Sequence, residues 1–360
     1  MKRYPKSVKH LDSHTVFKML SDFISASRRG MRTKKDGQRI RAATSQSYDY
    51  MQRLLQNFSN EKKFDLKLYL VNHLNASELE KAKKYWKQFH VQFTDYLYDD
   101  LNHYDNYVGQ TIKSLRVFLN YVNQDLMLNV GQFHKKFHVP KEEIQIVVLS
   151  PTQLNYLIYD KTLDDKLNAE LKVIKDIFVF GCTVALRFSD LMALQQFHLT
   201  RTGKDVYLKV RSQKTSSESN IKLPGYAVDI LNKYKSRRKH ILPQYSKGYF
   251  NKMLKNLSQT IEHNEPLIKV RSRRGKESII FKNEAKRQHY TLADHVTSHT
   301  MRRTAITTML RLGMQEQAVR RISGHAANSK EFFKYVSFSQ SYIDSETDMA
   351  FERLSNLALK

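Results

Sequence analysis

The chain is poor in the residues that interrupt helices. Its 360 residues include only eleven glycines and six prolines. These two residue types most often end a helix or mark a turn. The sequence shows no internal repeat and no low-complexity tract. It therefore predicts a mainly helical protein with a small β-sheet or hairpin component.

The first part of the chain carries four stretches with helical periodicity. Apolar residues recur every three or four positions over residues 15–24, 44–58, about 77–101 and about 110–123. In the fourth stretch Ile112, Leu115, Leu119 and Val122 lie on one face of the helix. Such stripes have to be buried, so we expect residues 1–145 to form a small helical domain.

A second domain is predicted to begin near Ser150. Ser150, Pro151 and Gln153 suit the N-cap, first and third positions of a helix. The charged segment 141–143 and a short extended run precede this signal. We expect the second domain to span residues 150–345.

The second domain is expected to be α+β. Helices are predicted to about Leu194, followed by a hairpin of residues 205–210 and 220–223 around a serine-rich turn. A further extended segment is predicted over 267–281, and short helices follow it.

A tail helix is predicted over residues 346–360. Phe351, Leu354 and Ala358 form an apolar stripe at spacings of three and four. A helix this short is marginal by itself, so it needs a surface on its own domain or on a neighbouring protomer.

The chain is strongly basic. Lysine and arginine total 61 against 35 aspartates and glutamates, which gives a formal net charge of +26. Solubility requires far less charge, so a polyanionic partner is expected. Nucleic acid fits better than an anionic membrane, because no basic amphipathic helix with an aromatic-rich face is present.

One loop of the first domain is especially rich in basic residues. Seven of them and one acid lie within residues 28–41, between the first two predicted helices. Such a loop can be merely solvated, but it also suits contacts with phosphates. The candidates for DNA binding there and on the fourth helix are Arg28, Arg29, Arg32, Lys34, Lys35, Arg39, Arg41, Lys113 and Arg116.

Cysteine usage and hydropathy favour a cytoplasmic location. The single cysteine, Cys182, excludes an internal disulfide, and it lies in an apolar stretch where a small core residue is expected. No apolar run approaches the length of a membrane span, and no signal-peptide core is evident.

Three local patterns in the second domain carry candidate chemistry. The first is Arg187, which interrupts an apolar stretch at a predicted helix junction. A charge in such a run is usually paired or functional. An ion pair with Asp190 would explain it without any catalytic role.

The second pattern opens a helix that ends at Gly313. His299 and Arg302 are three residues apart and so share a face. Arg302 is in line with the apolar side of that helix, where a guanidinium needs an anion to face. Arg303 lies off that side and is predicted to be a surface or DNA-backbone residue.

The third pattern is Ile322-Ser323-Gly324-His325, followed by Tyr335. Gly324 is expected to end a helix and to place His325 on the turn. Tyr335 would follow on a short helix. With 20 tyrosines in the chain, packing alone would explain any one of them.

Taken together, the order Arg, Lys, His-x-x-Arg, Gly-His, Tyr resembles the tyrosine recombinases, or phage integrases, and most of all those of bacterial mobile elements. The match extends from about Ser150 to Tyr342, and the basic helical first domain resembles the family's helical (SAM-like) core-binding domain. By position, the resemblance implies an active site of Arg187, Lys214, His299, Arg302, His325 and Tyr335, with Asp190 in support.

The resemblance also implies a function for each of these groups. Arg187 and Arg302 would clamp the scissile phosphate, and Lys214 would protonate the leaving oxygen. His299 would assist proton transfer, His325 would donate a hydrogen bond to the phosphate, and Tyr335 would attack.

The family works without a metal or other cofactor. It cuts and rejoins double-stranded DNA through a 3′-phosphotyrosyl link, as a homotetramer on paired sites, to integrate or excise a mobile element. A nucleoid-associated location and a possible DNA-bending accessory protein follow from the same resemblance.

Two features depart from the family pattern. Tyr335 lies ten residues after His325, where many relatives have nine, and Tyr342 is the distant alternative nucleophile. No β-rich arm-binding segment precedes the helical domain, so arm-type sites are not expected.

Three rival functions remain open on the sequence alone. A type-IB topoisomerase-like nicking-closing enzyme shares the pocket chemistry. A non-catalytic DNA-binding regulator explains the charge but leaves the motifs without a purpose. A metal-dependent nuclease could use His295 and His299, but no carboxylate cluster accompanies them.

Overall fold

The structure is a computed structural model. It describes residues 8–34, 36–211, 218–236, 239–261, 264–326 and 328–338, together with Asp344, Thr347, Asp348 and Phe351. Lys35, Lys214, Tyr342, Leu354 and Ala358, which the sequence patterns single out, lie outside these residues.

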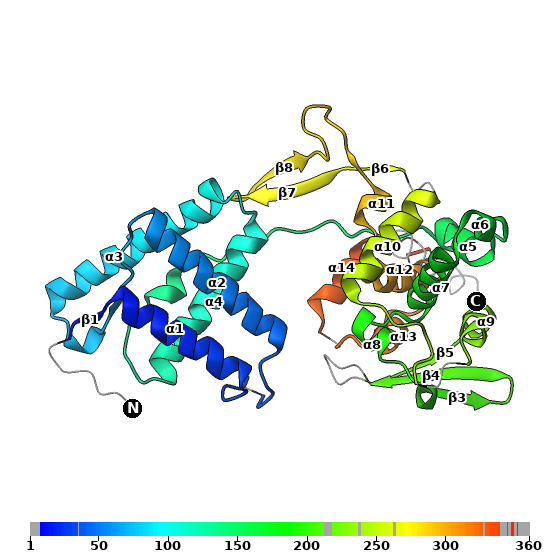
Figure 1. The fold of residues 1–360 in the computed structure, drawn as a ribbon, viewed down its shortest axis with the longest axis horizontal. Coiled ribbons are helices and arrows are strands. Elements are labelled where there is room, and N and C mark those ends of the chain that lie inside the picture. Colours follow the sequence, from blue (N-terminus) through cyan, green and yellow to red (C-terminus); the bar gives the residue numbers. More distant parts are fainter. Residues whose placement is uncertain are drawn as a thin grey trace. The chain divides into compact units, whose positions relative to one another are not determined.

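The chain divides into two compact units, and most of their helices and strands are labelled in Figure 1. Unit 1 contains the chain up to Ile144 and, in addition, residues Val270–Ile279. Unit 2 contains Gln145–Lys269 and the chain from Ile280 onward. Unit 1 is therefore built from two separate stretches of sequence.

Unit 1 is a bundle of four helices. They are α1 (Ser13–Arg28), α2 (Ala42–Glu61), α3 (Ala76–Asp95) and α4 (Asp105–Gln124), and the π-helix η2 (Tyr96–Asp100) extends α3. Short elements join them: β1 (His10–Leu11) pairs antiparallel with β2 (Leu68–Tyr69), and the 3-10 turns are η1 (Val71–His73) and η3 (Phe133–Lys136). The four helices cover the four predicted stretches.

Aromatic rings fill the core of unit 1. Phe23 of α1, Phe58 of α2, Phe89 of α3 and Phe118 of α4 are all fully buried, and Phe58 contacts the Phe89 ring edge-on at 6.0 Å between centroids. The only tryptophan of the sequence, Trp86, is also buried there. Each helix buries its apolar stripe, as the periodicity predicts.

The second stretch of unit 1 is a β-hairpin. Strands β7 (Lys269–Arg273) and β8 (Lys276–Ile280) are joined by Arg274 and Gly275, which both have positive φ. Positive φ at both turn residues is the conformation of the type I′ hairpin turn. The sequence predicts one extended segment over 267–281, and its folding back as a hairpin was not foreseen.

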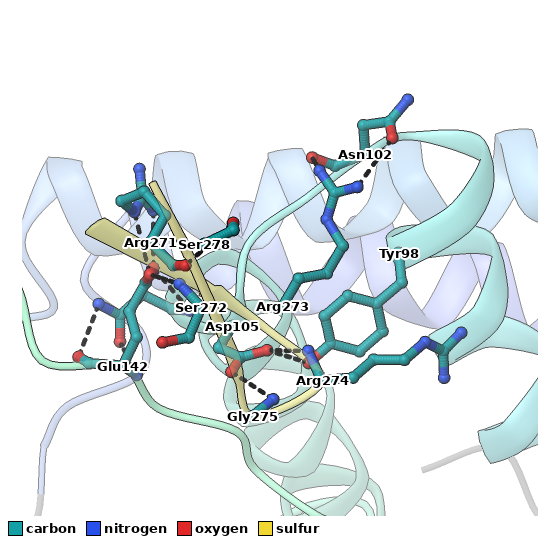
Figure 2. A network of polar contacts seen from close by, with 11 residues as sticks. Tyr98, Asn102, Asp105, Glu142, Arg271, Ser272, Arg273, Arg274, Gly275 and Ser278 are labelled. Atoms are coloured by element: carbon teal, nitrogen blue, oxygen red, sulfur yellow. Dashed lines mark hydrogen bonds and ion pairs between the residues drawn. The ribbon is translucent and has the colours of Figure 1, made fainter. Parts of the chain in front are cut away.

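Two buried carboxylates of unit 1, Asp105 of α4 and Glu142 of the segment after η3, hold this hairpin (Figure 2). Asp105 accepts the backbone N–H groups of Arg274 and Gly275 at 2.8 and 3.0 Å, as well as the Tyr98 hydroxyl at 2.6 Å. The Glu142 carboxylate accepts hydrogen bonds from both Nη2 and Nε of Arg271, at 2.7 and 3.0 Å. The basic residues of the hairpin thus neutralise acids within unit 1.

Unit 2 combines helices with small sheets. Its helices are α5 (Pro151–Tyr159), α6 (Thr162–Lys166), α7 (Ala169–Val184), α8 (Phe188–Met192), α9 (Gly225–Lys233), α10 (Lys247–Thr260), α11 (Leu292–His295), α12 (Ser298–Arg311), α13 (Glu316–Ser323) and α14 (Lys330–Phe338). The helix start predicted at Ser150 is confirmed, because Ser150 and Gln153 form a reciprocal capping box.

The main sheet of unit 2 has three antiparallel strands. They are β3 (Leu199–Thr202), β4 (Asp205–Arg211) and β5 (Glu218–Lys222), in that order. The predicted hairpin corresponds to β4 and β5, and β3 follows the 3-10 turn η4 (Gln196–His198). A second pair, β6 (Pro266–Leu267) and β9 (Tyr290–Thr291), takes up the start of the predicted 267–281 segment.

Helices α7 and α12 pack closely in the centre of unit 2. A side-chain carbon on Gly181 of α7 would come within 2.5 Å of the Met301 sulfur of α12, so any larger residue would force the Met301 side chain to move. Cys182 is buried beside it, and burial raises the pKa of its thiol. Cys182 is therefore a core residue, as expected. The α7–α12 contact sets the positions of the residues that end α7 and begin α12.

The mainly helical α+β fold predicted from the sequence is confirmed. Among the residues that the structure describes, no helix has both the length and the apolar character needed to cross a bilayer.

Candidate active site

Arg187 lies where α7 gives way to α8. Ala185 adopts a left-handed conformation, with φ of 54°, and this ends α7. Arg187 then serves as the N-cap residue of α8, with its side chain 23% exposed. Its Nη1 is 4.0 Å from the buried Asp190 Oδ2. The ion pair considered from the sequence is present, and it leaves part of the guanidinium accessible.

Arg302 is buried at the first turns of α12. Thr297 caps this helix by accepting the backbone N–H of His299. Arg302 is only 2% exposed, and its Nη1 donates to the Ala185 carbonyl at 3.0 Å. The left-handed turn at Ala185 therefore directs the Ala185 carbonyl toward Arg302, and the chain reaches Arg187 two residues later.

His325 follows the glycine that ends α13. Gly324 has φ of 64° and is the left-handed C-cap. This turn brings His325 against Arg302, whose Nη2 is 3.1 Å from the imidazole Nε2. The Ser323 Oγ is 2.8 Å from Nδ1 of the same ring.

Tyr335 completes the cluster from α14. It is 5% exposed, and its ring centroid is 5.9 Å from that of His325. The ring of Phe332, one turn earlier, packs edge-on against His325 at 5.5 Å. Tyr335 and Phe332 belong to one small buried core together with Ala185 and Ala305.

Desolvation and mutual repulsion lower the pKa values of the basic groups. Burial and then the neighbouring Arg187 lower the pKa of Arg302 to about 10. Burial followed by Arg302 and Arg187 lowers the pKa of His325 to about 3. His299, at the solvent-exposed start of α12, also has a lowered pKa, because its ring is partly desolvated and because Arg303 and Arg302 are near.

These shifts have one meaning for the site. Positive groups are held close together, and each is less stable in its charged form than it would be in water. A bound anion would relieve the repulsion between Arg187 and Arg302. The arrangement therefore suits an anion such as a phosphate.

The structure places five of the predicted catalytic residues around one point in unit 2. Arg187, His299, Arg302, His325 and Tyr335 come from four separate segments and influence one another electrostatically or by direct contact. Lys214 lies outside the described residues, between β4 and β5. Strand β5 is itself fixed to α13, because the Ser219 Oγ donates to the Arg321 carbonyl at 2.8 Å.

A groove beside the sheet holds residues that the sequence did not indicate. It has a volume of about 860 Å³, and its lining includes Lys209 and Arg211 of β4 and Arg321 of α13. Phe197 is 75% exposed at its edge and stacks on His198. Alternation along β4 could have indicated the two outward-facing cations, but nothing in the sequence placed Arg321 beside them.

The basic candidates of unit 1 fall into two groups. Those with exposed side chains are Arg28, Arg29, Lys34, Arg39, Arg41 and Lys113, of which Arg28 pairs with Asp49, while Arg116 is half-buried. Arg32 differs. Its guanidinium lies 4.0 Å from the centroid of the Phe23 ring and donates to the Ser27 Oγ at 2.7 Å. The Arg32 guanidinium is therefore used in contacts inside unit 1.

Arg303 and His295 lie near the same helix start. Arg303 is half-buried on α12, and His295 ends α11 with its ring 5.2 Å from that of Tyr290. Within the described part of the chain, no group of three or more His, Cys, Asp or Glu residues is arranged to hold a metal ion.

Comparison with known proteins identifies the fold. No protein-family model matches the chain, and neither does any curated protein sequence. Solved structures do match. A lambda integrase tetramer bound to a Holliday junction superposes with a TM-score of 0.57 at 11% identity, over 89% of this chain and 79% of that one.

Two further structures agree. The XerH site-specific recombinase in its post-cleavage complex with palindromic difH substrate gives a TM-score of 0.55 at 11% identity, covering 93% of this chain and 86% of the other. The Tn1549 transposon integrase in complex with transposon right end DNA gives 0.51 at 13% identity, covering 93% and 99%. The chain thus has the fold of the tyrosine-type site-specific recombinases and integrases.

Proposed function

We propose that this protein is a site-specific DNA recombinase that cuts and rejoins DNA through Tyr335. The observation that carries the proposal is the convergence of Arg187, Arg302, His325 and Tyr335 in unit 2. Arg302 lies at its centre, in contact with His325 and with the turn that leads to Arg187. A non-catalytic regulator would have no need to bury Arg302 and to hold a second, partly accessible arginine, a histidine and a tyrosine around it.

The chemistry follows from these groups. Attack on a phosphodiester increases the negative charge on its non-bridging oxygens. Arg187 and Arg302 supply planar donors that remain charged and can bind those oxygens in pairs. A bound phosphate relieves the repulsion between the two arginines, and their attraction for it grows as its oxygens become more negative in the transition state.

The proposed reaction conserves the bond energy. The Tyr335 Oη forms a bond to phosphorus, the bond to the 5′ oxygen breaks, and the tyrosine proton passes to a neighbouring base. Lys214 is our candidate for protonating the leaving 5′ oxygen, and His299 for assisting proton transfer. The 5′ hydroxyl of a second strand then reverses these steps, so rejoining requires no ATP and no metal.

The two units suggest a division of labour. We infer that unit 1 is the core-binding domain and that unit 2 is the catalytic domain. Exposed cations of unit 1 and the groove lined by Lys209, Arg211 and Arg321 would contact the duplex backbone. Arg32 is left out of this proposed surface, since its guanidinium is used within the core.

The printed descriptions of the structural neighbours support a nucleic-acid partner. They include a recombinase bound to its difH substrate and an integrase tetramer on a Holliday junction. By analogy we propose double-stranded DNA and a homotetramer on paired sites for this chain, in the nucleoid of a cell. A DNA-bending accessory protein would be a further component. Integration or excision of a mobile element, as for the transposon integrase, is the proposed outcome.

Covalent trapping tests the proposal. Duplexes from the DNA that flanks the gene, nicked near the expected cut, should become attached to the unaltered chain. Tyr335→Phe should abolish the adduct and keep DNA binding, because only the hydroxyl is lost. Tyr226→Phe is the matched control, since it removes a half-buried hydroxyl of unit 2 that bonds Thr183.

Three outcomes would contradict parts of this proposal. Trapping by Tyr335→Phe but not by Tyr342→Phe would move the nucleophile to Tyr342. Relaxation of plasmids that lack any special site would favour a type-IB topoisomerase-like enzyme. Binding without any adduct, on every flanking duplex, would favour a regulator.

A further inference from the structure

The two shortest polar contacts of the Ser323 hydroxyl bear on how His325 is protonated. The Ser323 Oγ is 2.7 Å from the Val319 carbonyl oxygen, one turn earlier in α13. It is also 2.8 Å from the His325 Nδ1. Ser323 is 2% exposed, so water does not take the place of either partner.

The two contacts are chemically unequal. A carbonyl oxygen can only accept a hydrogen bond, whereas an imidazole nitrogen can donate or accept. A serine hydroxyl has one proton to donate. At 2.7 Å the Ser323 Oγ and the Val319 carbonyl oxygen would repel each other unless that proton lay between them, so Ser323 donates it to this carbonyl. The Ser323 Oγ must therefore act as the acceptor toward His325, and Nδ1 must carry a hydrogen.

The contact of Arg302 with the ring agrees with this assignment. The Arg302 Nη2 can only donate, and it lies 3.1 Å from Nε2 and 3.3 Å from Nδ1. If Nδ1 carries the proton of the neutral ring, Nε2 has the free lone pair that the guanidinium needs. With the opposite tautomer, an N–H would face the N–H groups of Arg302 inside a largely desolvated site.

We propose that Ser323 is a positioning residue that holds neutral His325 as the Nδ1–H tautomer and so reserves Nε2 as the proton-accepting nitrogen of the active site. This inference rests on the proposed function only for its catalytic consequence. In the neutral ring, Nε2 has no hydrogen to donate to a phosphate. It becomes a donor only after it has taken up a proton, and the ring then carries hydrogens on both nitrogens.

The catalytic consequence is a defined order of events. When a phosphate binds, Arg302 can turn its Nη2 to the phosphate oxygens and free the Nε2 lone pair. Nε2 then accepts a proton, for which the Tyr335 hydroxyl is the nearby candidate, and the resulting imidazolium donates Nε2–H to the phosphate. Without Ser323 the two neutral tautomers compete, and only one of them can take this path.

Nitrogen NMR tests the tautomer without any DNA. The full chain is labelled at its histidine nitrogens, and the His325 signals are assigned with His325→Gln. The unaltered chain should show Nδ1 in the protonated range and Nε2 in the unprotonated range near neutral pH. Ser323→Ala should move both shifts toward a mixture, and Ser323→Thr, which keeps the hydroxyl, should restore the original pattern.

A matched control separates this effect from the loss of any buried serine hydroxyl. Ser114 of α4 is similarly buried and donates to the Gln110 carbonyl one turn earlier, and it belongs to unit 1 whereas His325 belongs to unit 2. Ser114→Ala should leave the His325 shifts unchanged. In the trapping assay, Ser323→Ala should slow adduct formation in proportion to the fraction of His325 that NMR finds in the other tautomer, and Ser323→Thr should recover most of the rate.

The outcomes can be told apart. An Nε2–H signal for His325 in the unaltered chain, or the same shifts in Ser323→Ala, would overturn the inference whatever the DNA assay shows. The expected tautomer together with no adduct on any duplex would leave the positioning of His325 in place and contradict the proposed function.

Discussion

The buried ion pair between Arg271 and Glu142 leads to a sharp prediction about the stability of unit 1. We consider Arg271→Met, which keeps most of the side-chain stem and removes the guanidinium. The Glu142 side chain is fully buried and accepts two hydrogen bonds from Arg271. The Ser272 N–H, at 2.8 Å, would remain as its main donor (Figure 2).

The expected loss follows from the burial of the carboxylate. Breaking a buried pair by removing one partner leaves an uncompensated charge and costs about 3–5 kcal/mol. Because Ser272 still donates to Glu142, we expect a value near the lower end, about 3 kcal/mol. With a urea dependence of roughly 1–3 kcal/mol per molar, the unfolding midpoint should fall by about 1–3 M.

The same hairpin offers a matched control. The Arg274 guanidinium pairs with Asp95 and Asp99 at 2.8 and 2.7 Å, but all three side chains are between 44% and 64% exposed. Exposed pairs contribute about 0–1 kcal/mol. Arg274→Met keeps the backbone N–H that bonds Asp105, so it should lower the stability of unit 1 by no more than about 1 kcal/mol.

Tryptophan fluorescence reports on the correct unit. Trp86 is the only tryptophan of the chain and is buried in the core of unit 1. Urea titrations of the full chain, followed by its emission, therefore measure unit 1 itself. Adding Glu142→Gln to Arg271→Met should recover about 1 kcal/mol or more, because an uncharged amide is easier to bury unpaired. Equal losses in the two Met variants, or no recovery in the double variant, would refute the reasoning.

Three further predictions concern unit 2 and DNA binding. Arg302→Lys should slow adduct formation more than tenfold, about 1.4 kcal/mol of transition-state stabilisation, since a point charge cannot replace the planar guanidinium. The control, Arg311→Lys on the same helix, should change the trapping rate little. A loss below tenfold for Arg302→Lys would mean that Arg302 is merely structural. DNA affinity should fall steeply with salt, with a log–log slope of about −0.9 for each phosphate contact, and a shallow slope in a filter-binding series would mean that the +26 charge serves another purpose. The pKa of His325 is lowered to about 3, below the ordinary value of about 6.5 that it regains on unfolding, so its contribution to stability is complete above about pH 6.5 and is lost as the pH falls toward 3. Melting temperatures of His325→Gln should depend less on pH over this range, and an unchanged dependence would mean that groups other than His325 cause the loss of stability in acid.

The candidate site could be read from the sequence to a large extent. His299 and Arg302 are three residues apart on one helix, so the spacing already predicts that they share a face. Gly324 likewise predicts the turn that carries His325. The segments that carry Arg187 and Tyr335 are distant in sequence, and only the resemblance joined them to the others. Ser323 was part of the same motif, but its function depends on which nitrogen of His325 it contacts, and spacing does not reveal this.

The sequence by itself determined the features that depend on residues close to one another along the chain. The four helices of unit 1, the capped start of α5 and the glycine that ends α13 all follow from periodicity and capping, which act within one or two turns. The tertiary structure decided how charges are paired. From the sequence, the cations of the β7–β8 hairpin and Arg32 could not be told from exposed basic residues, because composition gives the charge of a residue and not the group that it contacts. Folding placed Arg271 against Glu142 and Arg32 over an aromatic ring, since a buried carboxylate must be neutralised and a guanidinium gains by stacking on Phe23. Arg271 and Glu142 lie 129 residues apart in the chain, and only a closed core brings them within hydrogen-bonding distance.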